Sequence, residues 1–362
     1  MKNHIRHRET TLLIHSFPLS IAAIFLMLSC SCTPLSGYRE LMNTDIHPPI
    51  ILGAETASDD CFIFEFSEQI IPVQNSFKFF PPTGIERVAI SSISESSDQK
   101  ELLYIYTETS IPPGSRCMVE GEVKDPSGNT LFFSAAVYGW NDSIPDLVIN
   151  EFTTQGSSAH PDRVELFALS TGNTAGITFF DGVNSDRNQR VILPPIEIQK
   201  GEFIVIHCGK ETEFSLSETL STSESLSKFA SDSAWDVWIE SGEGLSGNNG
   251  IISLYTSPQG SLIDAVLYSN RNSGSDTNYK GFGSRALLNR VVVLADQEGW
   301  EPSDFDIIPE DGINPDNSTA TRSMCRISPD TDTDSRGDWY IVPTSKSTFG
   351  EINFAGVYTP SE

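Results

Sequence analysis

The acidic stretch Asp330–Trp339, with the sequence DTDTDSRGDW, brings together side chains that could hold a metal ion. Carboxylate oxygens are the ligands that Ca²⁺ prefers, but an EF-hand loop also needs Gly at its sixth position and Glu at its twelfth. A loop starting at Asp330 would have Ser335 and Ile341 there, so the stretch is not an EF-hand. Two interpretations remain. The favoured one is a solvated acidic turn before the strand Trp339–Val342. The other is a looser calcium cage made of four carboxylates: Asp330, Asp332, Asp334 and Asp338.

The same stretch contains the tripeptide Arg336-Gly337-Asp338, which is typical of integrin-binding loops. Binding residues gather on loops that a rigid sheet holds in place. We therefore predict two candidate binding loops, this tripeptide and the segment around Trp235 and Trp238.

Groups suited to catalysis are few. After residue 29 the chain has three histidines: His47, His160 and His207. Ser157 and Ser158 lie close to His160 in sequence, but neighbours in one loop do not make a catalytic triad. The G-x-S-x-G and P-loop motifs are absent. Glu151 and Glu165 could be a catalytic carboxylate pair. The sequence predicts no enzyme and no required cofactor.

Composition excludes one class of partner. The 362 residues carry a formal net charge of -26, with 20% charged and 38% hydrophobic residues. Nucleic-acid binding depends on Lys and Arg that neutralise phosphates, and electrostatic docking on anionic lipid has the same requirement. We therefore expect neither a nucleic-acid partner nor electrostatic membrane binding.

The N-terminus differs from the rest of the chain. A basic start is followed by the apolar run Phe17–Leu28, about a dozen residues and too short to span a bilayer, and then by Ser29-Cys30. This pattern resembles a bacterial lipoprotein signal peptide over residues 1–29. The resemblance implies that Cys30, which fits the cleavage pattern better than Cys32, becomes the acylated N-terminus of a tether, 30–47, that anchors the protein to a membrane of the cell envelope. The alternatives are an uncleaved anchor and cleavage to a soluble secreted form. In such lipoproteins a residue other than Asp after the acylated Cys allows export to the outer membrane, so Ser31 favours that location. The protein would then face the periplasm or the cell surface.

Residues 48–141 show the alternation of β-strands. In Phe62-Ile63-Phe64-Glu65-Phe66 the phenylalanines fall on one face, and 124–129 (KDPSGN) is a turn sequence. Six or seven such strands indicate an Ig-like sandwich. The early Phe66-Ser67-Glu68 and the late Asp125 to Asn129 turn resemble the S-layer-type bacterial Ig-like domain. That resemblance implies a spacer without an active site.

Residues 146–355 read as a second sandwich. The motifs INE (149–151), VEL (164–166), Asn249–Leu254 and a terminal TFG (348–350) resemble a lamin-tail domain, whose usual last motif is TPG. Because Glu151 and Glu165 belong to these strand motifs, the resemblance implies a structural role for both. Two inserts interrupt the pattern. The Ser/Thr/Glu-rich insert 211–234 reads as a surface loop, and for 283–300 helix and strand both stay open.

The cysteines suggest disulfides without proving them. Cys61 and Cys117 lie in the first predicted domain, and Cys208 and Cys325 in the second. Two intradomain bridges are expected, with buried thiols as the alternative. A Cys61–Cys117 bridge fits poorly because Cys61 faces away from the phenylalanine side of its strand.

Together these features predict an all-β protein of two consecutive Ig-like sandwiches after a lipoprotein signal peptide. The expected function is that of a non-catalytic envelope lipoprotein, in which the first domain spaces a recognition domain that meets an unknown protein or glycan partner. The alternatives are a surface adhesin and an accessory to a metal-dependent envelope hydrolase.

Overall fold

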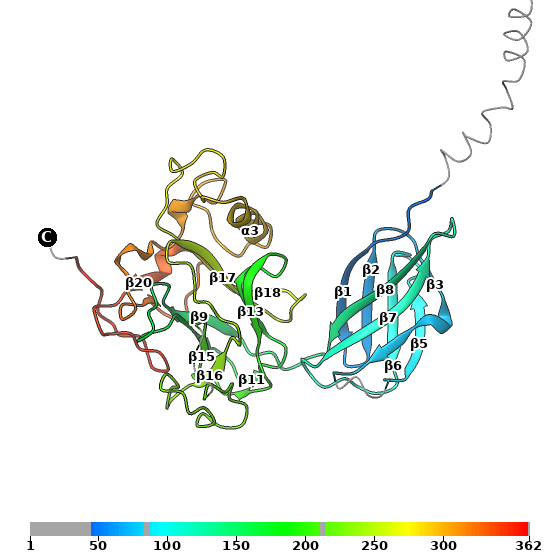
Figure 1. The fold of residues 1–362 in the computed structure, drawn as a ribbon, viewed down its shortest axis with the longest axis horizontal. Coiled ribbons are helices and arrows are strands. Elements are labelled where there is room, and N and C mark those ends of the chain that lie inside the picture. Colours follow the sequence, from blue (N-terminus) through cyan, green and yellow to red (C-terminus); the bar gives the residue numbers. More distant parts are fainter. Residues whose placement is uncertain (1–44, 83–86, 210, 212–213, 361–362) are drawn as a thin grey trace, which may run out of the picture. The chain divides into compact units, whose positions relative to one another are not determined.

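The computed structural model describes residues 45–82, 87–209, 211 and 214–360, in two compact units, Met1–His47 and Pro48–Glu362. Of the first unit only residues 45–47 are described, and all three are exposed. The predicted signal peptide, Cys30 and most of the tether therefore lie outside the described residues. The regular structure of the second unit consists mostly of β-strands, which confirms the predicted all-β class (Figure 1).

The strands of 48–141 form two antiparallel sheets. The first has the order β1-β2-β6-β5, and in the second β7 is flanked by β3, β4 and β8. Their bounds are β1 Ile51–Ser58, β2 Cys61–Phe66, β3 Ile71–Pro72, β4 Lys78–Phe80, β5 Ile90–Glu95, β6 Leu102–Thr107, β7 Arg116–Lys124 and β8 Thr130–Tyr138, with a 3-10 turn η1 at Gln74–Ser76. The predicted phenylalanine face is confirmed, because Phe62, Phe64 and Phe66 are buried in one core.

Residues 145–341 and the C-terminal segment form a second pair of sheets. One sheet has the order β16-β15-β10-β9-β19-β20 and the other β13-β12-β17-β18, while β11 and β14 pair apart. Their bounds are β9 Leu147–Phe152, β10 Arg163–Ala168, β11 Gly172–Asn173, β12 Thr178–Gly182, β13 Arg187–Ile192, β14 Glu197–Ile198, β15 Phe203–His207, β16 Trp235–Trp238, β17 Asn249–Tyr255, β18 Leu262–Ser269, β19 Met324–Arg326 and β20 Trp339–Ile341. The predicted strand Trp339–Val342 is thus confirmed as β20, which ends one residue earlier, at Ile341. Three 3-10 turns lie in the last part of the chain: η2 Pro309–Asp311, η3 Pro315–Asn317 and η4 Arg336–Asp338.

Alternation along each strand separates an apolar core from a second face. On β10, Val164 and Leu166 enter the core that the two sheets share, whereas Arg163 and Glu165 lie on the opposite face. The core side of β15 is made by Ile204 and Ile206 in the same way. The outer side of the six-stranded sheet therefore carries polar residues in the middle of apolar strands.

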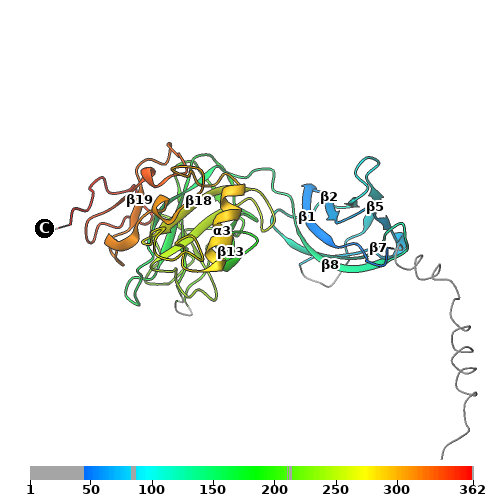
Figure 2. The same ribbon diagram turned by 90° about the horizontal axis from the view of Figure 1, so that it is seen from above.

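The second insert resolves as helix α3 (Arg285–Asp296), which lies beside the four-stranded sheet (Figure 2). The Ser284 hydroxyl caps its N-terminus by accepting from the Leu287 amide at 3.2 Å. Leu287, Val291 and Leu294 follow the helical spacing and are buried. Capping and this apolar stripe outweigh the strand preference of the β-branched run 291–293.

The predicted disulfides are absent from the described residues, because all four cysteines are buried free thiols: Cys61, Cys117, Cys208 and Cys325. Strand orientation explains the error. Cys117 enters the core of the first sandwich, where burial raises the pKa of its thiol to about 11, while Cys61 faces away from that core. Cys208 belongs to the core of the second sandwich, and Cys325 lies on the opposite face of the sheet beside Glu151.

Candidate functional site

The outer side of the six-stranded sheet holds a cluster of ionisable residues that we call the polar face: Glu151, Arg163, Glu165, His207 and Asp236. Four of the five are buried, and Arg163 is partly exposed. They are covered by the insert 211–234 and by the C-terminal segment 348–353, which bond to them. Charges buried at this density need partners, and each of these groups has them.

Glu151 and Glu165 are cross-strand neighbours on β9 and β10. The Glu151 carboxylate accepts from the Ser323 hydroxyl and, at 2.9 Å, from both the amide and the hydroxyl of Thr348. Glu165 accepts from the side-chain amide of Asn150 at 2.7 Å and from the Gly350 amide. The pair therefore holds the TFG segment against the sheet, which is a structural contact.

Burial raises the pKa of Glu165 well above its ordinary range, and the nearby charge of Glu151 adds to the rise. Burial raises the pKa of Glu151 as well, although the hydrogen bonds from Ser323 and Thr348 oppose this. Arg163 partly offsets both charges, and its guanidinium lies 4.1 Å from the centre of the Phe349 ring. These shifts follow from burial and do not by themselves indicate catalysis.

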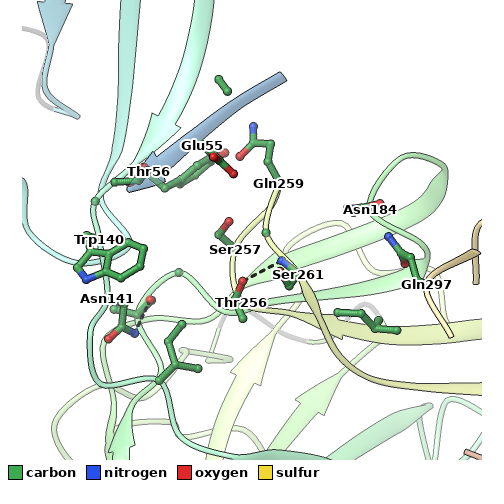
Figure 3. A pocket seen from close by; sticks show the side chains of 18 residues that line it. Glu55, Thr56, Trp140, Asn141, Asn184, Thr256, Ser257, Gln259, Ser261 and Gln297 are labelled. Carbon is green, nitrogen blue, oxygen red and sulfur yellow. Dashed lines mark hydrogen bonds between the residues drawn. The ribbon is translucent and has the colours of Figure 1, made fainter. Parts of the chain in front are cut away.

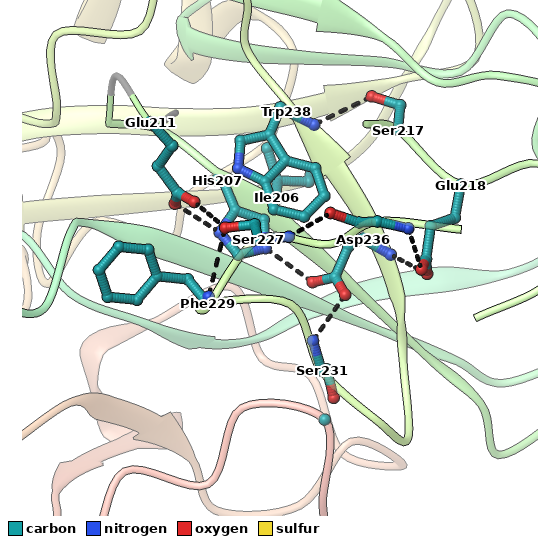
Figure 4. Close-up of polar contacts among 12 residues, drawn as sticks. Ile206, His207, Glu211, Ser217, Glu218, Ser227, Phe229, Ser231, Asp236 and Trp238 are labelled. Atoms are coloured by element: carbon teal, nitrogen blue, oxygen red, sulfur yellow. Dashed lines mark hydrogen bonds and ion pairs between the residues drawn. The ribbon is translucent and has the colours of Figure 1, made fainter. Parts of the chain in front are cut away.

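His207 lies between two carboxylates (Figure 4). Its Nδ1 is 3.0 Å from Glu211 Oε1, and its Nε2 is 2.6 Å from Asp236 Oδ1. The ring of Trp238 stacks on the imidazole at 4.0 Å with an angle of 7° between the rings. Burial would raise the pKa of Glu211, but the hydrogen bond and charge of His207 outweigh burial and lower it. With both nitrogens engaged, His207 has neither nitrogen available for a substrate.

The insert 211–234 is anchored to this cluster. Glu211 of the insert lies 3.0 Å from His207 Nδ1, and the Ser231 amide donates to Asp236 Oδ2 at 2.6 Å. Buried Glu218 accepts from the Asp236 amide at 3.1 Å. The expected surface loop is therefore tied to the sheet edge at several points.

The predicted binding loop around Trp235 and Trp238 is wrong, because both residues belong to strand β16. Trp238 is 7% exposed and packs on His207. Trp235 is partly buried, and its indole N–H donates to Glu202 Oε2 at 3.3 Å. Parallel pairing with β15 places both indoles in the sheet instead of on a loop tip.

Arg336, Gly337 and Asp338 form the 3-10 turn η4. The Asp338 carboxylate is buried and accepts from the amide and the hydroxyl of Thr333, each at 2.8 Å. The Arg336 guanidinium donates to the Glu310 carbonyl. The prediction of an exposed adhesion tripeptide is therefore wrong at Asp338, whose carboxylate closes a turn.

The four predicted calcium ligands do not converge. Asp332 and Asp334 meet Asp264 of β18, with one oxygen of each within 4.8 Å of the others, whereas Asp330 and Asp338 lie outside this group. Arg326 supplies a positive charge here, with Nη2 2.9 Å from Asp264 Oδ2 and Nη1 2.6 Å from Asp332 Oδ1. Calcium stays a prediction.

Asp264 is the buried member of this group. Burial raises the pKa of its carboxyl to about 7, and Arg326 opposes that rise. Its second oxygen, Oδ1, has no hydrogen-bond partner among the described residues. The pair Asp264–Arg326 joins the two sheets of the second sandwich, since Arg326 belongs to β19.

Figure 3 shows a pocket around Trp140 and Asn141. Its polar side chains are neutral apart from Glu55, and several are already bonded. Asn141 donates to the carbonyl oxygens of Asn173 and Ala175, at 2.8 and 3.0 Å.

Ser157 and His160 lie in a separate exposed loop, where their backbone groups bond to each other. The pocket is lined by no histidine, and in the loop the Ser157 hydroxyl accepts from the backbone amide of His160, while no bond to the His160 ring is present among the described residues. Neither place therefore has a serine activated by a base.

Sequence analysis missed Asp236, Glu211 and the pair Asp264–Arg326. A signal for Asp236 exists in WDVW (235–238), where a charge interrupts an apolar strand, as it does in the INE and VEL motifs. The sequence gives no sign of which charges face one another.

None of the helices in the described part of the chain has both the length and the apolar character needed to cross a membrane.

Comparison with known proteins places the second sandwich in a family. An uncharacterized protein of Treponema pallidum (strain Nichols) is 24% identical over 211 residues, which cover 57% of this chain and 53% of the relative. The chain thus spans about half the length of that curated relative.

Among solved structures, the N-terminal part of the bacterial S-layer protein SbsC is 11% identical, covering 62% of this chain and 44% of its own, with a TM-score of 0.25. CopC from Methylosinus trichosporium OB3b is 16% identical over 25% of this chain and 92% of its own, with a TM-score of 0.21. These two likenesses are distant, and no inference is based on them. A family model described as "protein second domain" matches residues 145–341, more than half of the chain, and the protein belongs to that family.

Proposed function

We propose that this protein is a non-catalytic lipoprotein of the cell envelope, in which an Ig-like domain (48–141) spaces a lamin-tail-type domain (146–355) from the membrane. One observation carries the proposal: the residues best suited to chemistry serve the fold. His207 is held between two carboxylates, and Glu151 and Glu165 receive hydrogen bonds from the C-terminal segment.

The geometry of three of the motifs, INE, VEL and TFG, supports the lamin-tail resemblance. INE on β9 and VEL on β10 are adjacent in the sheet, and the carboxylate of each binds TFG. Motifs separated by almost 200 residues thus form one structural unit. This structural contact explains why the three motifs occur together in one domain, and it requires no active site.

The anchor is tested by labelling cells with radioactive palmitate. We expect label on the protein and its loss in Cys30→Ser, while Cys32→Ser keeps it as the matched control. Equal labelling of the two variants would contradict the proposal that Cys30 carries the lipid anchor. An outer-membrane location is tested by cell fractionation, and surface exposure by protease treatment of intact cells beside a periplasmic control protein.

A further inference from the structure

A groove runs between helix α3 and the segment 300–307, and we call it the α3 groove. It has a volume of about 490 Å³. Its floor is made of the buried residues Val291, Trp300 and Ile307. Its sides include Val292, which is 50% exposed, and Phe305, which is 95% exposed. Large apolar groups held in water beside a concave apolar surface mark an interaction site.

The rim of the α3 groove is acidic. Glu298, Glu301 and Asp306 line it together with one base, Lys280, which pairs with Asp306 at 3.0 Å. Glu298 and Glu301 are exposed, and no ion pair to either is present among the described residues. The rim therefore keeps two negative charges without a cation.

Helix α3 adds to this negative potential. Its C-terminal end carries the negative pole of the helix dipole, where a basic residue is favourable. The last turn has no basic residue, and its final residue is Asp296. Charge at this end of the groove is thus complementary to a cationic ligand.

The helix side and the floor of the α3 groove are held in place by packing and hydrogen bonds. The helix is capped by Ser284 and fixed by the buried residues Leu287 and Leu294. The Trp300 indole donates to the Asp311 carbonyl at 3.1 Å, which fixes the ring in the floor. A groove formed in advance loses less freedom on binding.

We infer that the α3 groove docks a protein segment in which large apolar side chains are flanked by lysines or arginines. This inference rests on the proposed function as a binding module and specifies its partner. The apolar side chains would cover Phe305 and the floor, and the cations would face Glu298 and Glu301. Anionic lipid and nucleic acid are disfavoured by the same carboxylates.

Calorimetric titration of the full chain tests the inference with three blocked peptides. Acetyl-KKLFKK-amide has both features, acetyl-KKGGKK-amide has only the charge, and acetyl-EELFEE-amide has only the apolar pair. We expect the first to bind at least tenfold more tightly than either of the others. Equal binding of the two cationic peptides would overturn the inference, because it would show attraction to net charge alone. Absence of binding by the first peptide would overturn it too.

Variants locate the binding. Phe305→Ser and the double variant Glu298→Gln/Glu301→Gln should each weaken binding of acetyl-KKLFKK-amide by about tenfold, and the double variant should also flatten its salt dependence. Phe132→Ser is the matched control for Phe305, since Phe132 is 74% exposed on β8. If Phe132→Ser weakens binding of the peptide as much as Phe305→Ser does, the peptide does not bind in the α3 groove and the inference is overturned.

The palmitate experiment separates the two proposals. Labelled Cys30 with no binding of the peptide ends the groove inference alone. Peptide binding without palmitate label supports the groove inference and contradicts the proposed lipid anchor.

Discussion

Replacing Arg326 by methionine removes the buried cation that joins the two sheets of the second sandwich. Its guanidinium lies 2.9 Å from Asp264 Oδ2, and its Nε donates to the Ile149 carbonyl at 2.8 Å. Removing one partner of a buried ion pair leaves the other charge uncompensated and costs about 3–5 kcal/mol. We expect a loss of that size in the free energy of unfolding at pH 8.

The loss should depend on pH, because Asp264 titrates in this range. Its folded pKa of about 7 is above the ordinary value of 3.8. A carboxyl with a raised folded pKa adds stability that is fully present below its unfolded pKa and is lost as the pH rises through 7. At pH 5 Asp264 is mainly protonated, so its charge attraction to Arg326 is absent. The loss for Arg326→Met should then fall to about 1–2 kcal/mol, the cost of the missing hydrogen bonds.

Urea unfolding followed by tryptophan fluorescence measures both values, and the Trp339 ring, 5.0 Å from the Arg326 guanidinium, reports locally. The control is Lys280→Met, which breaks the exposed pair with Asp306 and should cost less than about 1 kcal/mol. Adding Asp264→Asn to Arg326→Met should recover stability at pH 8. Equal losses at pH 5 and pH 8, together with additive effects in the double variant, would refute the reasoning.

Three other outcomes are expected. His207→Gln can satisfy only one of the two carboxylates beside it, so it should lose about 2–4 kcal/mol in urea unfolding and speed proteolysis within 211–234, and unchanged cleavage there would contradict the anchoring. Glu165→Gln removes a carboxyl with a raised pKa, so its stability relative to the parent protein should improve as the pH rises from 5 to 9, whereas a constant difference would argue against the shift. The four cysteines of Pro48–Glu362 should resist iodoacetamide in the folded protein and all react in urea without reductant, and fewer than four reactive thiols would indicate a disulfide.

Strands with strong alternation were predictable from the sequence. The phenylalanines of β2 and the apolar positions of β10 have the period of two, and period alone assigns their faces. Strand β1 was missed because, after Ile51 and Leu52, its residues GAETAS are small or polar and show no alternation of large apolar side chains. Strand β16 was assigned to the edge of a loop, since parallel pairing with β15 depends on chain distant from it.

The polar face shows the limit of sequence analysis more clearly. Glu151 and Glu165 could be assigned a structural role from their motifs, but their partners lie 197 and 185 residues away. Propensity and periodicity act over a few residues and carry no information on such pairs. The disulfide prediction failed for a related reason, because the number of cysteines does not say which face of its sheet each one occupies.

The bonds from Glu151 and Glu165 to Thr348 and Gly350 also set the order in which the second sandwich can form. A chain emerges from the ribosome with its N-terminus first, so β9 and β10 are present long before residue 350. Until then these two carboxylates lack the donors of the C-terminal segment, and the sheet stays open where β19 pairs with β9. Completion of the domain is thus delayed until almost the whole chain has been made. For the exported lipoprotein proposed above, that delay would keep the chain unfolded for longer before it passes the membrane.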